Sequence, residues 1–315
     1  MASMKLAVGL YEHLVNELID EGISEAAREN LRAEVRELDP GDSHGYIAQY
    51  LATHIRKAFV SLPEADRLNR QIQLANKVLV LLAESAPESF DATKAKLLRA
   101  EILLAILHEP AERPDTPLSA SCLMTGTRQD PSLVSQLRKE LATADQVDIL
   151  CSFIKWGGVR IMEESLQRLT SASRPLRVIT TSYMGATDLK AVEFLQALPC
   201  TELRVSYDTR RTRLHAKAYI IHRKTGFGVA YIGSSNLSQA ALTEGLEWNV
   251  KISQNESPHL WTKVCATFDT YWNDSEFVAY QPESREQLRT ALERERSQAE
   301  KEQPTTFCSR CNWYG

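Results

Sequence analysis

The sequence predicts an α/β domain whose sheet is covered by helices on both faces, preceded by an all-helical N-terminal domain. Between residues 122 and 280, short runs rich in β-branched residues alternate with stretches of helical periodicity, a pattern typical of α/β folds. Before residue 109, apolar residues recur every three or four positions, as they do along one face of a helix. A proline-rich segment separates the two regions.

The helical domain is expected to span residues 1–108. Ile47, Leu51, Ile55 and Phe59 stand four residues apart and form one apolar stripe of a helix. Two further stripes consist of Leu74, Val78, Leu81 and Leu82, and of Leu98, Ile102, Ala105 and Ile106. Residues 1–21 are also expected to form a helix. They are not expected to be a signal peptide, because they lack the basic segment that opens one. We expect this domain to bind a partner protein or nucleic acid.

Residues 109–121 are expected to form a linker. They contain three prolines and few apolar residues, and proline both fixes φ and removes a backbone donor.

The α/β domain is expected to span residues 122–280, followed by a charged C-terminal helix and tail at residues 281–315. Strands are predicted at residues 147–153, 176–180, 203–206, 216–222, 228–232 and 248–252. Helices are predicted at residues 162–169, 189–198 and 258–271, and residues 282–302 are expected to form a solvated helix.

Composition narrows the class of protein. With 43% hydrophobic and 25% charged residues, the chain resembles soluble globular proteins. No apolar run reaches the roughly 18 residues that a membrane-spanning helix requires, so we expect a cytoplasmic protein with no membrane partner. The net charge is −4, whereas nucleic-acid-binding domains are usually basic. Any bound nucleic acid must therefore contact a local basic patch.

The chain has six cysteines. Cys122, Cys151, Cys200 and Cys265 lie in apolar or strand-like contexts and are expected to be reduced core residues. Cys308 and Cys311 form a single CxxC in the tail, whereas a structural zinc site requires two more ligands. We therefore expect a flexible tail, and no metal or other cofactor.

The residues that predict chemistry lie between positions 213 and 250. His215 and Lys217 are two residues apart in a strand-like run that leads into the strand predicted at residues 216–222, so their side chains are expected on one face of the sheet. The next predicted strand leads into Gly233-Ser234-Ser235-Asn236, a turn expected to open a helix and to direct backbone N–H groups at an anion. Glu247 follows at the start of another strand.

These residue types suit cleavage of a phosphodiester. The imidazole of His215 can attack phosphorus, and the Lys217 ammonium can neutralise charge on the phosphoryl oxygens. Asn236 and the Ser235 hydroxyl can donate further hydrogen bonds, and Glu247 can orient His215 through its second ring nitrogen. We therefore predict His215, Lys217, Asn236 and Glu247 as catalytic residues. A structural alternative for Glu247 is an edge-strand carboxylate paired with an arginine.

Several flanking residues are predicted to bind substrate. One of Ser234 and Ser235 is expected to donate a hydrogen bond to the phosphate and the other to cap the helix. Ser235 is expected to lie nearer the phosphate. The other predicted residues are Arg210, Arg211, Arg213, Lys155, Trp156 and Tyr183. The arginines can contact flanking phosphates or form a solvated loop, and the tryptophan can stack on a base or pack in the core. His222 falls on the opposite face from His215 and is expected to be structural.

The HxK and GSxN segments resemble the HKD signature of the phospholipase D superfamily, here His215-x-Lys217 and Gly233-Ser234-Ser235-Asn236. The longer form of the signature has an aspartate five residues after the lysine, where this chain has His222. The nuclease-like branch often lacks that aspartate and has a glutamate after the turn, as Glu247 does. The resemblance implies a phospholipase D-like mixed sheet and catalysis through a phosphohistidine without a divalent metal.

The superfamily builds one site from two such motifs, and this chain has one. The resemblance therefore implies a homodimer in which His215 of each copy meets at a two-fold axis. The chain to about residue 280 also resembles the N-terminal nuclease module of bacterial fusion proteins with a superfamily II helicase, through residues 151–156, 180–187 and 245–249. No Walker A motif occurs in these residues, so a helicase is expected as a separate or missing partner.

The sequence and this resemblance thus predict a hydrolase, a metal-independent endonuclease for which DNA is favoured over RNA as the substrate. Two alternatives remain: a non-catalytic nucleic-acid-binding or dimerisation module for a helicase, and a phospholipase.

Overall fold

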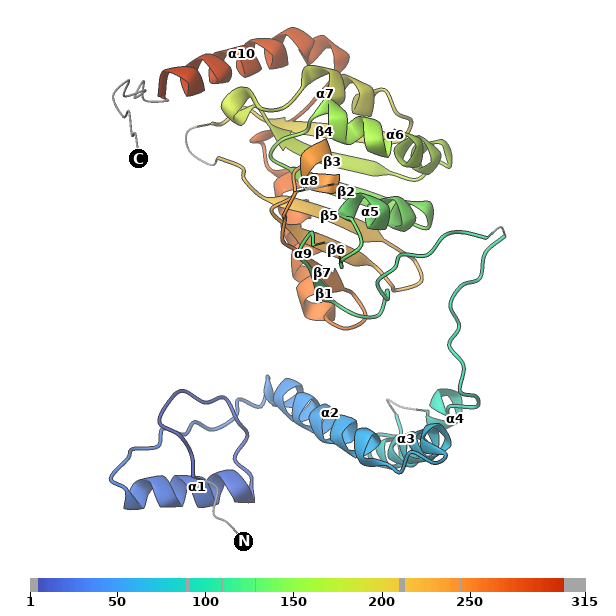
Figure 1. The fold of residues 1–315 in the computed structure, drawn as a ribbon, viewed down its shortest axis with the longest axis vertical. Coiled ribbons are helices and arrows are strands. Elements are labelled where there is room, and N and C mark those ends of the chain that lie inside the picture. Colours follow the sequence, from blue (N-terminus) through green and yellow to red (C-terminus); the bar gives the residue numbers. More distant parts are fainter. Residues whose placement is uncertain are drawn as a thin grey trace, which may run out of the picture. The chain divides into compact units, whose positions relative to one another are not determined.

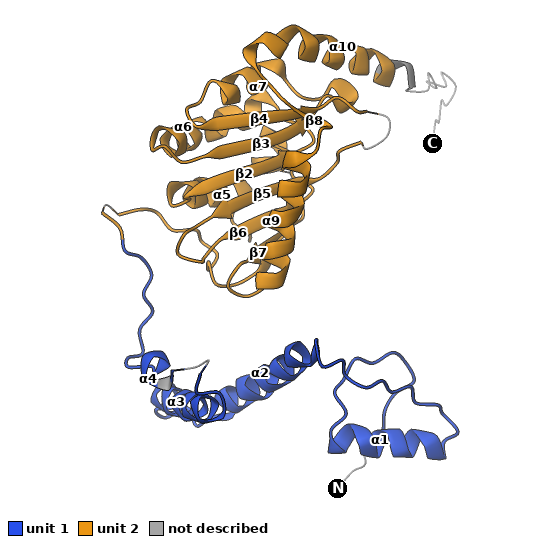
Figure 2. Cartoon of the chain, turned by 180° about the vertical axis from the view of Figure 1, so that it is seen from behind, with its two compact units in different colours: residues 1–106 blue, residues 107–315 orange. Residues whose placement is uncertain are grey.

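The structure is a computed structural model that describes residues 5–88, 91–108, 110–127, 129–209, 213–243 and 245–302. The chain divides into two compact units, residues 1–106 and residues 107–315 (Figure 2). Each unit is described by itself. The domain boundaries predicted at residues 108 and 121 stay predictions.

The described residues of unit 1 form four helices joined by irregular segments. They are α1 (Glu17–Arg28), α2 (Ser43–Ser61), α3 (Arg67–Ser85) and α4 (Ala92–Ala95) (Figure 1). The side chain of Asn16 caps α1 by accepting a hydrogen bond from the Ile19 amide at 3.0 Å. The helix predicted within residues 1–21 therefore begins only at Glu17.

The helix predicted from the stripe Leu98, Ile102, Ala105 and Ile106 is wrong, because residues 96–107 are irregular. Leu98, Ile102 and Ile106 are 83–86% exposed. A helix this short is marginal in water unless its apolar face packs against a neighbour. The periodicity is present, but nothing in unit 1 buries it.

Unit 2 is built on one mixed sheet of eight strands in the order β1-β7-β6-β5-β2-β3-β4-β8. The strands are β1 (Cys122–Met124), β2 (Gln146–Cys151), β3 (Leu176–Thr181), β4 (Thr201–Ser206), β5 (Lys217–His222), β6 (Val229–Gly233), β7 (Asn249–Ser253) and β8 (Phe277–Ala279). β2, β3 and β4 are parallel, and the other pairs are antiparallel. The six predicted strands are confirmed within two residues at each end, whereas β1 and β8 were not predicted.

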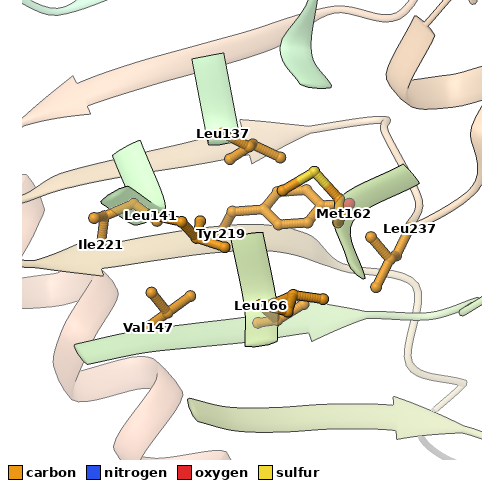
Figure 3. A pocket seen from close by; sticks show the side chains of 9 residues that line it. Leu137, Leu141, Val147, Met162, Leu166, Tyr219, Ile221 and Leu237 are labelled. Atoms are coloured by element: carbon orange, nitrogen blue, oxygen red, sulfur yellow. The ribbon is translucent and has the colours of Figure 1, made fainter. Parts of the chain in front are cut away.

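Helices cover both faces of this sheet, as predicted. They are α5 (Leu133–Ala142), α6 (Trp156–Ser171), α7 (Leu189–Gln196), α8 (Gln239–Thr243), α9 (Pro258–Asn273) and α10 (Arg285–Glu302), with short 3-10 turns at Tyr183–Gly185 and Pro282–Ser284 (Figure 1). One core joins the sheet to α5, α6, α7, α8 and α10. A second core lies under α9 and includes Trp261, Phe268 and Trp272. In Figure 3, Leu137 and Leu141 of α5 and Met162 and Leu166 of α6 surround strand residues of the first core.

Residues 282–302 were expected to form a solvated helix, but α10 (Arg285–Glu302) is buried along one side. Leu288 and Leu292 are four residues apart and at most 3% exposed, so they form the apolar stripe that attaches α10 to the first core. The high charge of the surrounding residues hid this stripe. Cys200 also departs from its predicted core location, because it follows α7 in an exposed turn.

Two buried cations hold the β1–β7 side of the unit together. Arg223 lies 2.5 Å from the Glu140 carboxylate, which also accepts a hydrogen bond from the Tyr231 hydroxyl at 2.7 Å. Lys251 is fully buried and donates to the carbonyl of Pro117 at 2.7 Å and to the hydroxyl of Thr116 at 2.8 Å. The second half of the predicted linker is therefore fixed to the sheet.

A third polar network lies on the opposite face, under α9. The buried carboxylate of Asp148 accepts two hydrogen bonds from Arg177, both at 2.7 Å, and lies 2.6 Å from Nε2 of His222. His222 packs edge-on against Trp261 at 5.4 Å. These contacts give His222 a structural place in the second core.

Candidate active site

His215 and Lys217 lie side by side where β5 begins. The Lys217 ammonium is 3.0 Å from Nδ1 and 3.3 Å from Nε2 of His215, and it donates to the His215 carbonyl at 2.7 Å. His215 is exposed, whereas Lys217 is 5% exposed. Burial lowers the pKa of Lys217 from its ordinary value, although the nearby Glu247 carboxylate acts in the opposite direction. The predicted pairing of these two side chains on one face is thus observed.

The turn after β6 is held close to the strand that follows it. A side-chain Cβ at Gly233 would lie 2.1 Å from the carbonyl oxygen of Trp248, so only glycine fits there. The Oδ1 atom of Asn236 accepts a hydrogen bond from the Phe153 amide at 3.0 Å. This bond joins the turn to the end of β2, immediately beside His215, and leaves the Asn236 amide nitrogen for another partner.

The helix predicted to open at this turn begins later, at Gln239, and has five residues. Its first turn is capped by Ser238, whose hydroxyl accepts from the Ala241 amide at 3.3 Å. Neither Ser234 nor Ser235 therefore caps a helix, and a helix this short directs little charge at an anion. Both expectations are corrected.

The accessible serine of the turn is not the one that was expected to lie nearer the phosphate. Ser235 is fully buried, and its hydroxyl accepts a hydrogen bond from the side-chain Nδ2 of Asn249 at 2.8 Å. Ser234 is exposed, and its hydroxyl bonds to the Trp248 amide at 3.1 Å and to the Trp248 carbonyl at 3.4 Å. Alternation continues through the turn, so the second serine points inward. Ser234 is the serine whose hydroxyl faces solvent at the site.

Glu247 is half-buried beside the turn. The residue after it, Trp248, is fixed to the turn by two hydrogen bonds with the Ser234 hydroxyl. The predicted hydrogen bond between Glu247 and His215 is not formed. Instead, the Phe153 ring meets the His215 imidazole edge-on, with 6.2 Å between ring centroids. The Glu247 carboxylate makes no hydrogen bond or ion pair with a described residue. It is close enough to Lys217 for a favourable electrostatic interaction. The alternative of a pair with a described arginine is likewise not observed.

Of the predicted substrate-binding residues outside the turn, Arg213 and Tyr183 lie together, whereas Lys155 and Trp156 contact other residues. Arg213 is exposed, and its guanidinium lies 6.0 Å from the centre of the Tyr183 ring, so these two are brought together. Lys155 pairs with Asp188 at 3.5 Å. Trp156 is half-buried, and it packs edge-on against Phe194 and beneath the ammonium of Lys190. The packed alternative for the tryptophan is therefore the one observed. Arg210 and Arg211 lie outside the described residues.

Comparison with known families identifies the domain that carries this site. Residues 134–272 match a family model described as "Cardiolipin synthase, PLD-like domain". They include His215, Lys217, Asn236 and Glu247. This stretch of unit 2, which is less than half of the chain, is therefore similar to a phospholipase D-like domain. A comparison with curated proteins finds no match.

Solved structures that are similar to this chain share little sequence with it. NucT from Helicobacter pylori is 16% identical over 51% of this chain and 99% of its own, with a TM-score of 0.41. Nuc from Salmonella typhimurium, a phospholipase D family member, is 14% identical over 51% and 99%, with a TM-score of 0.38. Phosphatidylserine synthase from Haemophilus influenzae is 9% identical over 58% and 44%, with a TM-score of 0.40. Similarities this low carry no conclusion about activity.

Two residues of unit 2 that position the site were not found from the sequence. Tyr219 shares a strand face with Lys217, and its hydroxyl donates to the Ser235 carbonyl at 3.1 Å beneath the turn. Figure 3 shows its ring extending past Met162 toward Leu237. Phe153 contacts His215 and bonds to Asn236. The period-two spacing from Lys217 could have indicated Tyr219, whereas nothing in the sequence indicates Phe153.

In the part of the chain that the structure describes, no three His, Cys, Asp or Glu side chains are grouped so that they could hold a metal ion. Cys308 and Cys311 lie outside that part. No described helix is long and apolar enough to cross a membrane.

Proposed function

We propose that this chain is a metal-independent phosphodiesterase that cleaves nucleic acid, with DNA as the proposed substrate and RNA as the alternative, and acts as a homodimer. The observation that carries the proposal is the pairing of an exposed His215 with Lys217, whose ammonium is 3.0 Å from Nδ1 of the ring. Asn236 and Glu247 complete a group with a nucleophile, a cation and a carboxylate that pairs with none of the described residues. Such a group suits an anionic ester, which needs attack on phosphorus and neutralisation of oxygen charge.

The chemistry proposed for this site proceeds in two steps. An imidazole nitrogen of His215 forms a bond to phosphorus while the bond from phosphorus to the leaving oxygen breaks. That oxygen takes a proton from His215 of a second copy. Water then attacks the phosphohistidine, gives its proton to the second imidazole and releases the phosphate product. Lys217 neutralises the phosphoryl oxygens in both steps.

The homodimer is proposed because one motif supplies one histidine, whereas the two steps need a nucleophile and an acid. The exposure of His215 supports this, since a second copy must reach it. If the chain is strictly monomeric while it cleaves phosphodiesters at full rate, the shared site is wrong. Analytical ultracentrifugation alongside the activity assay decides the point.

The decisive experiment is cleavage of labelled single- and double-stranded DNA and RNA in EDTA. His215→Ala is expected to reduce cleavage by about 10³-fold or more, because it removes the nucleophile. His259→Ala is the matched control, because His259 is an exposed histidine on α9, over the opposite face of the sheet. Cleavage that requires Mg²⁺ and persists in His215→Ala would overturn the proposed mechanism.

Phosphatidyl transfer is the second candidate, because the description of the matching family model names cardiolipin synthase. Release of head groups from phospholipid vesicles, lost in His215→Ala, would favour it over nuclease activity. Tight DNA binding that survives His215→Ala, without turnover of any phosphodiester, would instead favour a non-catalytic module.

The N-terminal helices are proposed to bind a partner, for which a helicase is the candidate. The proposal is supported by exposed apolar residues in unit 1, such as Leu51 on α2 and Leu81 on α3. If deletion of residues 1–108 leaves both nuclease activity and binding of a purified helicase unchanged, this role is excluded.

A further inference from the structure

The C-terminal helix α10 packs closely against the turn Tyr183–Gly185, which follows β3. The helix comes after residues 134–272, the stretch that matches the family model. Gly185 has a φ of +60°, and a Cβ at this residue would clash with the carbonyl oxygen of Leu292 and lie 2.9 Å from the backbone nitrogen of Arg296. Only glycine therefore allows the turn and the helix to approach this closely.

Two adjacent residues of α10 bind two segments at one edge of the sheet. Nε of Arg296 donates to the carbonyl of Gly185 at 2.7 Å. The hydroxyl of Thr209 donates to Oε1 of Glu295 at 2.9 Å, and both residues are buried. The turn follows the end of β3, and Thr209 follows the end of β4, which is parallel to β3. β5 begins at this same edge, because its first residue pairs with the last residue of β2, which is also parallel to β3. α10 thus holds chain segments at the edge that carries the candidate active site.

The turn needs such support because its backbone is strained. Met184 has a φ of +58°, in a region that residues other than glycine rarely occupy. Such residues keep this conformation only where the surrounding structure fixes it. The Met184 side chain is 46% exposed, so its own packing contributes little. The contact with α10 is therefore a restraint that keeps Tyr183, the first residue of the turn, in place.

Tyr183 lies close to residues that the proposed reaction uses. The centre of its ring is 6.0 Å from the guanidinium carbon of Arg213. Arg213 is exposed and precedes His215 by two residues, so their Cα atoms are at most about 7 Å apart. An aromatic ring can stack on a base, and a guanidinium can bind a phosphate that flanks the scissile one. His215 and Lys217, in contrast, are held by the start of β5 and by each other.

We propose that α10 is a positioning helix of the candidate active site, with Glu295 and Arg296 as positioning residues. They act through Tyr183 and Arg213, which bind a base and a phosphate of the substrate beside the scissile phosphate. The inference rests on the proposed function and specifies its substrate as a polymer longer than one phosphodiester unit. A long substrate therefore depends on α10, whereas a small phosphodiester, which reaches only the histidine and the lysine, does not.

The test compares a labelled single-stranded oligonucleotide with bis(p-nitrophenyl) phosphate, which has one phosphate and no base, in EDTA. In the full-length protein, Glu295→Ala/Arg296→Ala is expected to raise KM for the oligonucleotide by about tenfold, because small displacements of substrate-positioning residues are costly. Contacts that bind the ground state and the transition state equally affect KM alone, so kcat for the oligonucleotide and kcat/KM for the small ester should change by less than about twofold. Equal losses on both substrates, or no loss on either, would overturn the proposal.

Arg289→Ala/Glu293→Ala is the matched control, because it removes the same two residue types from the same helix. Arg289 and Glu293 are exposed, and they pair with each other along α10 at 3.7 Å. The control should keep the KM of the unaltered protein for both substrates. The same rise in KM in both variants would assign the effect to helix charge or stability, and would contradict the role of the two contacts.

Tyr183→Ala tests whether α10 acts through this ring. In the unaltered protein it should raise KM for the oligonucleotide by about tenfold, the effect expected for loss of one stacked base. In Glu295→Ala/Arg296→Ala it should raise KM by less than about twofold further, because residues that act through one shared contact are not additive. Full additivity would show that the helix does not act through Tyr183.

Glu295→Gln tests the bond to Thr209 itself. The amide oxygen can still accept from the Thr209 hydroxyl, so this variant should keep the KM of the unaltered protein, whereas Glu295→Ala should raise it severalfold. A rise of the same size in both variants would assign the effect to the negative charge of Glu295, and the positioning role of its hydrogen bond would be wrong.

If the unaltered protein does not cleave the oligonucleotide, the proposed function fails separately, and binding tests the positioning role. Fluorescence anisotropy then measures the Kd of the labelled oligonucleotide for the unaltered protein and the two double variants. A Kd about tenfold higher in Glu295→Ala/Arg296→Ala and unchanged in Arg289→Ala/Glu293→Ala supports the inference. Absence of binding, or one Kd for all three proteins, overturns it.

Discussion

The two units of this chain use apolar residues very differently. In the part of the chain that the structure describes, every fully buried apolar side chain lies between Met124 and Leu292. Unit 1 has comparable helical stripes, yet residues such as Leu51 and Ile102 are 51% and 83% exposed. An apolar stripe therefore shows that a helix needs a neighbour, and not that it has one. In unit 2 the sheet is that neighbour, and the apolar faces of the helices pack against it.

Polar residues show the same contrast. Unit 2 buries the ion pair between Glu140 and Arg223, whose side chains are at most 4% exposed. Unit 1 has the pair between Glu25 and Arg28, of almost equal length at 2.6 Å, whose side chains are 34% and 75% exposed. The two pairs have similar geometry and different surroundings, which makes them a direct test of the effect of burial.

The largest expected effect is the difference in stability lost when each of these two ion pairs is broken. Glu140→Ala should destabilise unit 2 by about 3–5 kcal/mol, because it leaves the buried Arg223 guanidinium without its counter-charge. Glu25→Ala should change the free energy of unfolding by less than about 1 kcal/mol, since water screens an exposed pair. Urea denaturation followed by circular dichroism measures both. Equal losses would show that unit 1 is packed as densely as unit 2.

A smaller difference is expected for aliphatic residues. Leu166 on α6 is 1% exposed, so Leu166→Ala should cost about 2–5 kcal/mol through lost burial and a residual cavity. Ile102→Ala should cost less than about 0.5 kcal/mol, as for other exposed positions. Differential scanning calorimetry on both variants checks the prediction. A loss above about 2 kcal/mol for Ile102→Ala would mean that a partner surface covers this residue.

The smallest effect is expected for pH, and it should be confined to unit 2. Burial raises the pKa of Asp148, but hydrogen bonds from Arg177 and His222 outweigh it and leave this pKa below the ordinary value. The unfolded chain therefore binds a proton at higher pH than the folded chain does. The contribution of Asp148 to stability is present above the ordinary aspartate pKa of about 3.9 and is lost as the pH falls through the lower pKa of the folded state.

Tryptophan fluorescence can follow this loss in unit 2 alone, because residues 1–106 contain no tryptophan. Trp261 contacts His222, and Trp272 packs with Arg177. The variant Asp148→Asn should be less stable at neutral pH but should lose less stability on acidification. An acid-side slope identical to that of the unaltered protein would rule out this carboxylate as the cause.

Much of unit 2 could be predicted from the sequence, because its strands are bounded by turn residues and its central strands are apolar. The pairing of His215 with Lys217 follows from strand alternation alone. β1 and β8 have three residues each, too few for a pattern to emerge. The inward turn of Ser235 and the contact of Phe153 with His215 depend on how separate segments meet, which no local pattern records. In unit 1, the stripe at Leu98–Ile106 failed as a helix because burial is a property of neighbours.

The close fit at Gly233 has a consequence for protein engineering. Glycine allows β6 to approach the Trp248 carbonyl, and Ser234 then binds both backbone polar groups of that residue. Segments 233–236 and 245–249 are therefore one transplantable block, although other residues separate them along the chain. A graft that moved residues 233–236 into a new scaffold without residues 245–249 would lack the carboxylate of Glu247.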